Sequence, residues 1–344
     1  MPRVSPIVES ASCIKKLDRP ILTSEDLPYD SNLVFNAGVT KFNGKYIMVF
    51  RNDYGTDPER FLRERGIPCT SVGVAVSDNG VDGWKVRAEH LLDSNITQAE
   101  TGREIRRFYD PRIAVIDGKP YLTMAADARH GIYGVIAEVD DNFEKVNVIS
   151  MSVPNNRNMV LFPEKINGYY YRLERPMAMF GEDNGNYDVW CSRSRDLIYW
   201  GDSKVVLDQR HVPFANDKIG PAAPPIKTNK GWLATFHAVD IDPTRGKNGW
   251  EPHWDCRYFA GIMLLDLEDP TKIVGMYKHP LLAPDRPYET DEGFRQNVIF
   301  PGSLILEDDG EVKIYYGAAD TVECLATANV DDLISLCLEE SAEL

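Results

Sequence analysis

A two-strand unit with a tight turn recurs along the chain and constrains its fold more than any other feature. Each unit is a strand-like apolar run, a turn of Asn-Gly, Asp-Gly or Lys-Gly, and a second strand-like run. Short turns of this kind between apolar runs are typical of β-hairpins. Five units occupy residues 39–51, 112–126, 161–175, 223–238 and 302–318, with turn glycines Gly44, Gly118, Gly168, Gly231 and Gly310.

Repeated β-rich units that contain Gly and Trp between their strands favour a β-propeller, in which four-stranded sheets surround a central axis. The spacing between hairpins leaves room for about four strands in each unit. We therefore predict an all-β, single-domain, five-bladed β-propeller over residues 21–329. A short extension (1–20) precedes it and an acidic helical tail (330–344) follows it. A pair of β-sandwiches or an irregular β-barrel is the alternative fold.

Composition narrows the classes of partner. The 344 residues include 38 Lys and Arg against 53 Asp and Glu, which gives a net charge of −15. Such a surface repels phosphate backbones and anionic lipid, so it disfavours nucleic-acid and membrane partners. We see no apolar run long enough for a membrane helix and no signal-peptide pattern. Six scattered cysteines lack disulfide or zinc spacing, so we expect a cytoplasmic protein without a bound metal.

Polar residues gather where the predicted hairpins begin and end. The start of a hairpin's first strand lies beside the end of its second strand, so both sets should meet at one end of the propeller. Four basic groups at one end of the propeller of an acidic protein indicate that it binds an anion of about the size of phosphate. Aromatic residues beside them are suited to contact a sugar ring. The carboxylates and amides are Asn36, Asp53, Asp110, Asp127 and Asp320; the basic residues are Arg157, Arg175, Lys218 and His237; the aromatic residues are Tyr109, Phe180, Trp254 and Tyr258.

Each of these residues also has a purely structural interpretation. Asp110 before a proline could cap a turn, and Arg175 could pair with a neighbouring glutamate. Lys218 could be solvated in a loop, and His237 could be a core histidine with satisfied hydrogen bonds. The convergence of five blades on one end favours a binding site over these separate explanations.

The same stretches resemble glycoside hydrolase family 130, the β-mannoside phosphorylases and their hydrolytic relatives. Members of this family fold as five-bladed β-propellers, which agrees with the five hairpins found from the turns alone. The resemblance covers nearly the whole chain in family order. Its blocks are VFNAGVTKFNGKY (34–46), RND (51–53), YDPRI (109–113), RNMVLFPEKINGYYYRLERP (157–176), KIGPAAPPIKT (218–228), ATFHAVD (234–240) and FPGSLILEDDGEVKIYYGAADT (300–321).

The resemblance implies a role for each matched residue. It implies Asp110 as the general acid, a phosphate-binding set, and a set that holds the donor sugar. It also implies a homo-oligomer. The phosphate-binding set is Arg157, Arg175, Lys218 and His237; the sugar-binding set is Asn36, Arg51, Asp53, Tyr258 and Asp320.

Two departures from the family pattern concern the acceptor sugar. Tyr109 precedes the acid where many members have glutamate, and residues 54–69 form a long insertion. Both lie where they could shape the acceptor subsite, and the insertion favours a β-1,2-linked or short substrate. The linkage, β-1,2 or β-1,4, and the acceptor, mannose, glucose or N-acetylglucosamine, stay open.

The expected reaction is inverting phosphorolysis of a β-mannoside to α-D-mannose 1-phosphate and a free sugar. Inorganic phosphate is the co-substrate, and no metal or organic cofactor is expected. The acid, Asp110, should have a pKa raised by burial or by anions such as Asp53. One alternative is a hydrolase, which needs a second carboxylate from Asp53, Asp127 or Asp320. The other alternative is a carbohydrate-binding propeller without catalysis.

Overall fold

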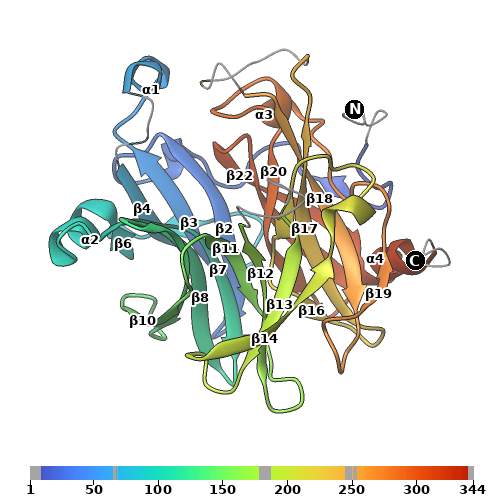
Figure 1. Cartoon of the computed structure of the whole chain (residues 1–344). Helices are drawn as coiled ribbons and strands as arrows, with labels where there is room; N and C mark the ends of the chain where they lie inside the picture. The colour runs from blue at the N-terminus through green and yellow to red at the C-terminus, as the bar shows by residue number, and fades with distance from the viewer. Residues whose placement is uncertain are drawn as a thin grey trace.

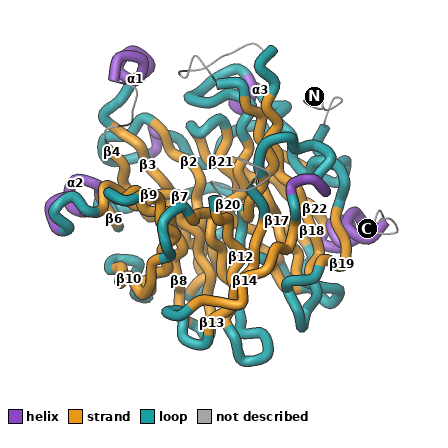
Figure 2. Tube along the Cα trace, viewed as in Figure 1, coloured by secondary structure: helices purple, strands orange, loops and turns teal. Residues whose placement is uncertain are grey.

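Five antiparallel sheets surround a central axis in the computed structural model of the chain, which describes residues 9–64, 67, 69–177, 187–244, 250 and 254–339 (Figure 1). Strands and loops make up most of the chain, and the helices are few and short (Figure 2). The predicted five-bladed β-propeller is confirmed.

The first three blades follow the chain from the innermost strand outward. Blade 1 consists of β2 (Leu33–Phe42), β3 (Lys45–Tyr54), β4 (Cys69–Ser77) and β5 (Lys85–Val86), and β6 (Leu92–Asp93) also pairs with β4. Blade 2 consists of β7 (Ile105–Ile116), β8 (Lys119–Ala128), β9 (Gly131–Val139) and β10 (Val146–Met151). Blade 3 consists of β11 (Asn156–Leu161), β12 (Tyr170–Pro176), β13 (Val189–Ser194) and β14 (Trp200–Leu207).

The last two blades complete the ring. In blade 4, β15 (Ile219–Pro221) and β16 (Ile226–Lys227) both pair with β17 (Trp232–Ile241), followed by β18 (Cys256–Leu265) and β19 (Ile273–Met276). Blade 5 consists of β20 (Ile299–Leu306), β21 (Glu311–Ala318), β22 (Val322–Asn329) and β1 (Lys15–Lys16). Because β1 comes from the other end of the chain, its pairing with β22 ties the two terminal regions together.

In the part of the chain that is described, helices occur in the connection between β3 and β4, between blades, or after the last blade. They are α1 (Pro58–Glu64) within the insertion, α2 (Ser94–Glu100), α3 (Pro287–Thr290) and α4 (Val330–Glu339), with single 3-10 turns η1 (Ser24–Asp26) and η2 (Gln209–His211). Helix α4 packs against β18 and β19 and buries Leu333 and Ile334. None of these helices is both long and apolar enough to cross a bilayer.

Three hairpin turns owe their shape to a pair of left-handed residues. In the β2–β3 turn, φ is 50° at Asn43 and 75° at Gly44, and residues 117–118 and 167–168 repeat this combination. Two consecutive left-handed residues define a type I′ turn, whose twist matches that of the flanking strands. The Asn-Gly and Asp-Gly pairs therefore form the predicted hairpins by local geometry alone.

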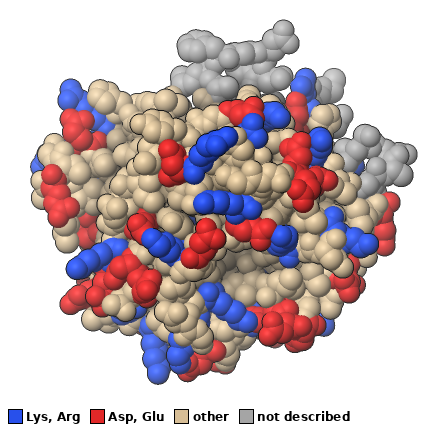
Figure 3. Space-filling model, turned by 90° about the horizontal axis from the view of Figure 1, so that it is seen from below, with Lys and Arg blue, Asp and Glu red and all other residues tan. Residues whose placement is uncertain are grey.

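Apolar side chains between neighbouring blades form the core. The cluster between blades 3 and 4 includes the fully buried Phe162, Trp232 and Phe236. A second cluster joins blades 4 and 5 and includes Leu264 and Tyr316. On the lower face, acidic and basic side chains are interspersed (Figure 3), so the negative charge of the chain is not gathered into one patch there.

A substitution at Gly302 tests how closely the innermost strands pack around the axis. A Cβ at this position of β20 would lie 1.8 Å from the carbonyl oxygen of Ala37 in β2. The Gly302→Ala substitution should push the innermost strands of blades 1 and 5 apart and lower the free energy of unfolding by about 2–3 kcal/mol. The control is Gly201→Ala, whose Cβ would meet nothing within 4 Å and should change it by less than about 1 kcal/mol. Chemical denaturation measures both, and equal stabilities would contradict the close strand contact.

Candidate active site

A cavity of about 120 Å³ lies where the innermost strands of the blades meet. It brings together all but one of the predicted catalytic, phosphate-binding and sugar-binding residues. The exception is Asp53, which lies behind Arg51. Phe180 lies outside the described residues. The lining consists of the predicted Asn36, Arg51, Asp110, Arg157, Arg175, Lys218, His237, Tyr258 and Asp320, together with Asn158, Trp254, Arg295, Val298 and Phe300.

β-bulges direct several of these side chains into the cavity. Strands β2, β7 and β11 each shift register near the same end. In each bulge one residue adopts a left-handed conformation, with φ of 54° at Asn36, 53° at Asp110 and 57° at Asn158. Asn and Asp tolerate this region better than other side chains except glycine. Since bulges re-aim side chains, the three equivalent bulges deliver three polar groups to one site.

Asp110 is enclosed by donors from blades 1 and 3 and is only 8% exposed. Its Oδ1 accepts hydrogen bonds from Asn36 Nδ2 at 3.0 Å and from Arg51 Nη1 at 3.1 Å. Its Oδ2 accepts a hydrogen bond from Arg157 Nη2 at 3.0 Å. Hydrogen bonds and opposite charges of this kind stabilise the ionised form of a carboxyl group.

The expected raised pKa of Asp110 is not found. Burial acts in the expected direction, but the guanidinium groups of Arg51, Arg157 and Arg112 outweigh it, and the pKa lies well below its ordinary value. The expectation failed because Asp53, the anion proposed to raise the pKa, does not face Asp110 directly. With these partners Asp110 is therefore a carboxylate.

Arg51 separates the two carboxylates. It donates from Nε to both oxygens of Asp53, at 3.1 and 3.0 Å, and from Nη2 to Asp53 Oδ2 at 2.6 Å. Thr70 Oγ1 donates to Asp53 Oδ1 at 2.7 Å. Asp53 is fully buried. These bonds fix the guanidinium of Arg51, so that its remaining Nη1 points at Asp110.

His237 holds one of the predicted phosphate-binding arginines. Its Nδ1 lies 3.3 Å from the carbonyl oxygen of Pro221, and its Nε2 lies 2.8 Å from Arg175 Nη1. A carbonyl can only accept, so Nδ1 carries the proton and Nε2 accepts from Arg175. Burial and the nearby Arg175, Lys218 and Arg157 charges lower the pKa of His237 well below its ordinary value. The ring is neutral, and the cationic groups are the two arginines and Lys218.

Unpaired donors mark the basic side of the cavity. The buried Nε groups of Arg157 and Arg175 have no hydrogen-bond partner among the described residues. Buried polar groups without a partner are costly, and an oxyanion between two guanidinium groups supplies partners for such donors. Lys218, whose ammonium forms an ion pair with Asp217, adds a third positive charge.

Another part of the cavity lining combines aromatic rings with a carboxylate. Tyr258 stacks on Trp254 with ring centroids 5.8 Å apart. Asp320 Oδ2 accepts a hydrogen bond from Arg295 Nη1 at 3.1 Å. Burial raises the pKa of Asp320, although Arg295 and Arg51 act against it. Rings and hydrogen-bonding groups of this kind can hold a sugar.

Tyr109 forms a wall beside the acid. Its ring lies 5.1 Å from the guanidinium carbon of Arg51 and 5.2 Å from that of Arg157. Its hydroxyl donates to Asp127 Oδ1 at 2.8 Å, and Arg107 Nε donates to Asp127 Oδ2 at 2.7 Å. The residue that departs from the family pattern therefore packs on two arginines of the site.

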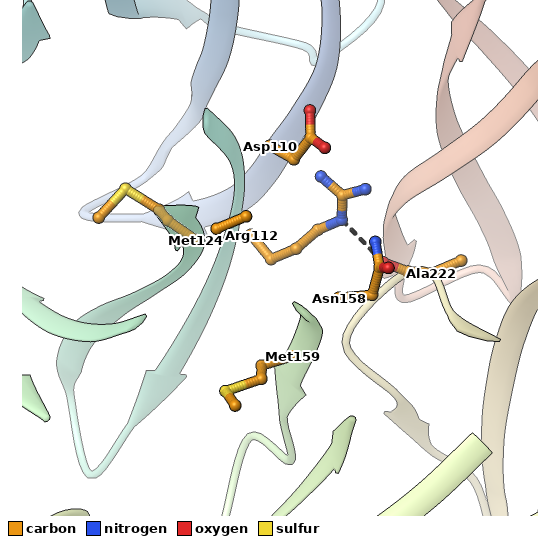
Figure 4. Close-up of a pocket in the computed structure, with 7 residues that line it drawn as sticks. Asp110, Arg112, Met124, Asn158, Met159 and Ala222 are labelled. Atoms are coloured by element: carbon orange, nitrogen blue, oxygen red, sulfur yellow. Dashed lines mark hydrogen bonds between the residues drawn. The ribbon is translucent and has the colours of Figure 1, made fainter. Parts of the chain in front are cut away.

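Arg112 secures the strands that carry the site. It is 4% exposed and extends below Asp110, where its Nε donates to Ala222 O at 2.7 Å (Figure 4). Its other nitrogens donate to the carbonyl oxygens of Asn36, Pro111 and Pro301, at 3.0, 2.9 and 3.3 Å. Four backbone segments, from blades 1, 2, 4 and 5, thus share one buried cation.

Some contributors were not predicted from the sequence. Arg112 lies in the YDPRI block, but the sequence predicts no role for it, because nothing in a single residue indicates that it binds carbonyls of distant blades. Asn158 and Phe300 lie at predicted hairpin starts, so their positions were available. Arg295 lies between α3 and β20, outside the hairpin pattern, so the hairpin pattern does not predict that it lines the cavity.

Comparison with known proteins adds three findings. The model of glycoside hydrolase family 130, described as β-1,4-mannooligosaccharide phosphorylase, matches residues 4–339. The chain is 31% identical over 328 residues to a 1,2-β-oligomannan phosphorylase of Thermoanaerobacter sp. strain X514, covering 93% of this chain and 98% of that protein. It is 33% identical to a β-1,2-mannobiose phosphorylase of Listeria innocua, and the match covers 83% of this chain and 86% of that protein.

The fold agrees with a solved structure. The structure of the β-1,2-mannobiose phosphorylase from Listeria innocua in complex with β-1,2-mannobiose superposes with a TM-score of 0.76 at 23% identity. The superposition covers 95% of this chain and 99% of that one. At this identity the likeness speaks for the fold.

The protonation of His237 can be measured directly. We expect its ring to stay neutral, with the proton on Nδ1, throughout the range from about pH 5.5 to 8, because burial and three nearby cations oppose charging. Histidine-labelled ¹⁵N spectra distinguish the tautomers, and the His237→Asn variant assigns the signal. A ring that gains a proton near the ordinary histidine pKa of about 6.5 would contradict this arrangement.

Proposed function

The match over residues 4–339 means that the chain belongs to glycoside hydrolase family 130, and from this premise we propose that it is an inverting β-mannoside phosphorylase. It cleaves a β-mannoside with inorganic phosphate and releases α-D-mannose 1-phosphate and a free sugar. Curated relatives carry names for both β-1,2- and β-1,4-linked substrates, so we assign the bond class and leave the linkage to experiment.

One observation carries the proposal: a candidate general acid, Asp110, lines the same cavity as a set of three cationic side chains. Arg157, Arg175 and Lys218 come from blades 3 and 4, whereas Asp110 comes from blade 2. Arginine pairs bind phosphate by charge-assisted hydrogen bonds with defined geometry. The positive charges of Arg157, Arg175 and Lys218 along one cavity favour an oxyanion as the ligand.

The chemistry needs few protein groups. An oxygen of phosphate attacks C1 of the mannosyl unit, the bond from C1 to the acceptor oxygen breaks, and the proton of Asp110 passes to that oxygen. Phosphate is already anionic, so no base is required to activate it and neither a metal nor an organic cofactor is part of the proposal. Holding the nucleophile in line contributes several kcal/mol to the lowering of the barrier.

Arg157 links phosphate binding to the acid. Its Nη2 donates to Asp110 at 3.0 Å and helps to keep the carboxyl ionised. A phosphate dianion near Arg157 and Arg175 competes for this guanidinium and adds negative charge close to Asp110. Both effects raise the pKa of a carboxyl group. We therefore propose that Asp110 becomes a proton donor only when phosphate is bound.

Water is a poorer fit as the nucleophile, because inverting hydrolysis needs a second carboxylate to act as base. Asp53 is fully buried and engaged by Arg51 and Thr70. Asp127 has both oxygens bonded, by Arg107 and Tyr109, and Asp320 is bonded to Arg295. The contacts of all three carboxylates favour phosphate over water.

The proposed function predicts strict phosphate dependence. A panel of β-1,2- and β-1,4-linked mannobioses and mannosyl-glucose is incubated with and without inorganic phosphate, and mannose 1-phosphate and free mannose are quantified. We expect mannose 1-phosphate only with phosphate, and the best substrate identifies the linkage. Free mannose formed at the same rate without phosphate would replace this proposal with hydrolysis.

The role of Asp110 as the general acid is tested with the Asp110→Asn variant, which keeps the shape of the side chain but cannot donate the acid proton. We expect turnover to fall by about 10²–10⁴-fold, the usual contribution of a general acid, while the variant still folds and binds sugar. Turnover at the normal rate would exclude Asp110 as the acid. Loss of sugar binding together with turnover would assign Asp110 to binding instead.

A further inference from the structure

A second cavity, of about 560 Å³, lies between blades 1 and 2. Helix α2, at the left of Figure 1 beside β4 and β6, contributes Gln98, and the start of β7 contributes Arg106 and Arg107. Arg103, from the link between α2 and β7, and Asp127 also line it. The cavity therefore collects three arginines and one aspartate in a chain with a net charge of −15.

The charges in this cavity do not cancel. Both oxygens of Asp127 are occupied, by Arg107 Nε at 2.7 Å and Tyr109 OH at 2.8 Å. The side chains of Arg103 and Arg106 are exposed and form no ion pair with any residue that the structure describes. Guanidinium groups only donate hydrogen bonds. A neutral sugar brings no negative charge to balance these arginines, so an excess of positive donors fits a ligand that carries an anion.

Tyr109 connects this cavity to the catalytic one. Its ring packs over Arg51 and Arg157, which line the catalytic cavity, and its hydroxyl bonds to Asp127, which lines the second cavity. Tyr109 thus contacts lining residues of both cavities. An acceptor group that extends past Tyr109 would enter the second cavity.

The proposed reaction also gives the direction in which the acceptor leaves. In an inverting displacement the leaving group departs opposite to the nucleophile. Arg157, Arg175 and Lys218 would hold phosphate on blades 3 and 4, so the acceptor departs toward the opposite side of the ring. Blade 1 and the junction with blade 2 lie there, because five blades in order place blade 1 across from blades 3 and 4.

We infer that the cavity between blades 1 and 2 binds an anionic group carried by the acceptor portion of the substrate, with Arg103 and Arg106 as its ligands. The inference rests on the proposed phosphorylase function. A phosphate ester and a uronic acid carboxylate share the required chemistry, since both accept charge-assisted hydrogen bonds from guanidinium groups. Arg107 is a positioning residue, which holds Asp127 and through it Tyr109.

The test uses the synthetic direction with the full chain. α-D-Mannose 1-phosphate is supplied with N-acetylglucosamine, N-acetylglucosamine 6-phosphate, glucose or glucuronic acid, and the release of inorganic phosphate is followed. We expect KM for at least one charged acceptor to be about tenfold lower than for its neutral counterpart, with similar kcat. The phosphate and carboxylate arms show which anion is preferred, and added salt should reduce the preference.

Two variants locate the effect. The Arg103→Gln/Arg106→Gln double variant should raise KM for the charged acceptor by about tenfold or more and leave KM for the neutral acceptor unchanged. The matched control is Arg129→Gln, which removes an exposed arginine that pairs with Glu104 outside the cavity. This control should keep the preference of the wild-type chain.

The outcomes separate the two proposals. Equal KM values for charged and neutral acceptors in the wild-type chain would overturn this inference, while turnover of the neutral acceptors would leave the phosphorylase function standing. A charge preference that survives in the double variant would also overturn it. Failure of every acceptor, together with no phosphorolysis of any β-mannoside, would count against the phosphorylase function itself.

Discussion

The position of the site residues depends on the hydrogen bonds of one buried guanidinium group, that of Arg112. It donates to backbone carbonyls of blades 1, 2, 4 and 5 just below Asp110. A propeller blade contacts mainly its neighbours, so the centre of the ring needs a group that several blades share. One cation with five donors meets this need, and its charge is offset by Asp110 above it. The same residue therefore fixes the strands that carry the site and lowers the pKa of the acid.

The charge state of Asp110 follows from this arrangement. Asp110 is surrounded by Arg51, Arg112 and Arg157, with Asn36 as a further donor, and stays ionised. An acid that is unprotonated without phosphate would contribute little to cleavage by water. Binding of phosphate by Arg157 and Arg175 would both supply the nucleophile and weaken the hold on Asp110. A phosphorylase could thus suppress hydrolysis without excluding water from the site.

Local sequence predicted the hairpins but not the details of the site. Asn43-Gly44 and its equivalents form type I′ turns by local geometry, so the fold could be read from the turns. The family blocks identified the residues of the cavity, and nine of the ten named residues line it. The bulges at Asn36, Asp110 and Asn158 depend on strand register, which no short segment specifies. The low pKa of Asp110 depends on Arg51 lying between two carboxylates, and the neutral His237 depends on one carbonyl, so both required the three-dimensional structure.

The central claim is that phosphate converts Asp110 from a carboxylate into an acid. The most direct measurement is a pH titration of the side-chain carboxyl in ¹³C-aspartate-labelled protein, with and without saturating phosphate, with the Asp110 signal assigned by its loss in Asp110→Asn. The account predicts a pKa well below the ordinary aspartate value in the free protein and a clear rise when phosphate binds. A pKa that is already raised in the free protein, or that phosphate leaves unchanged, would contradict it.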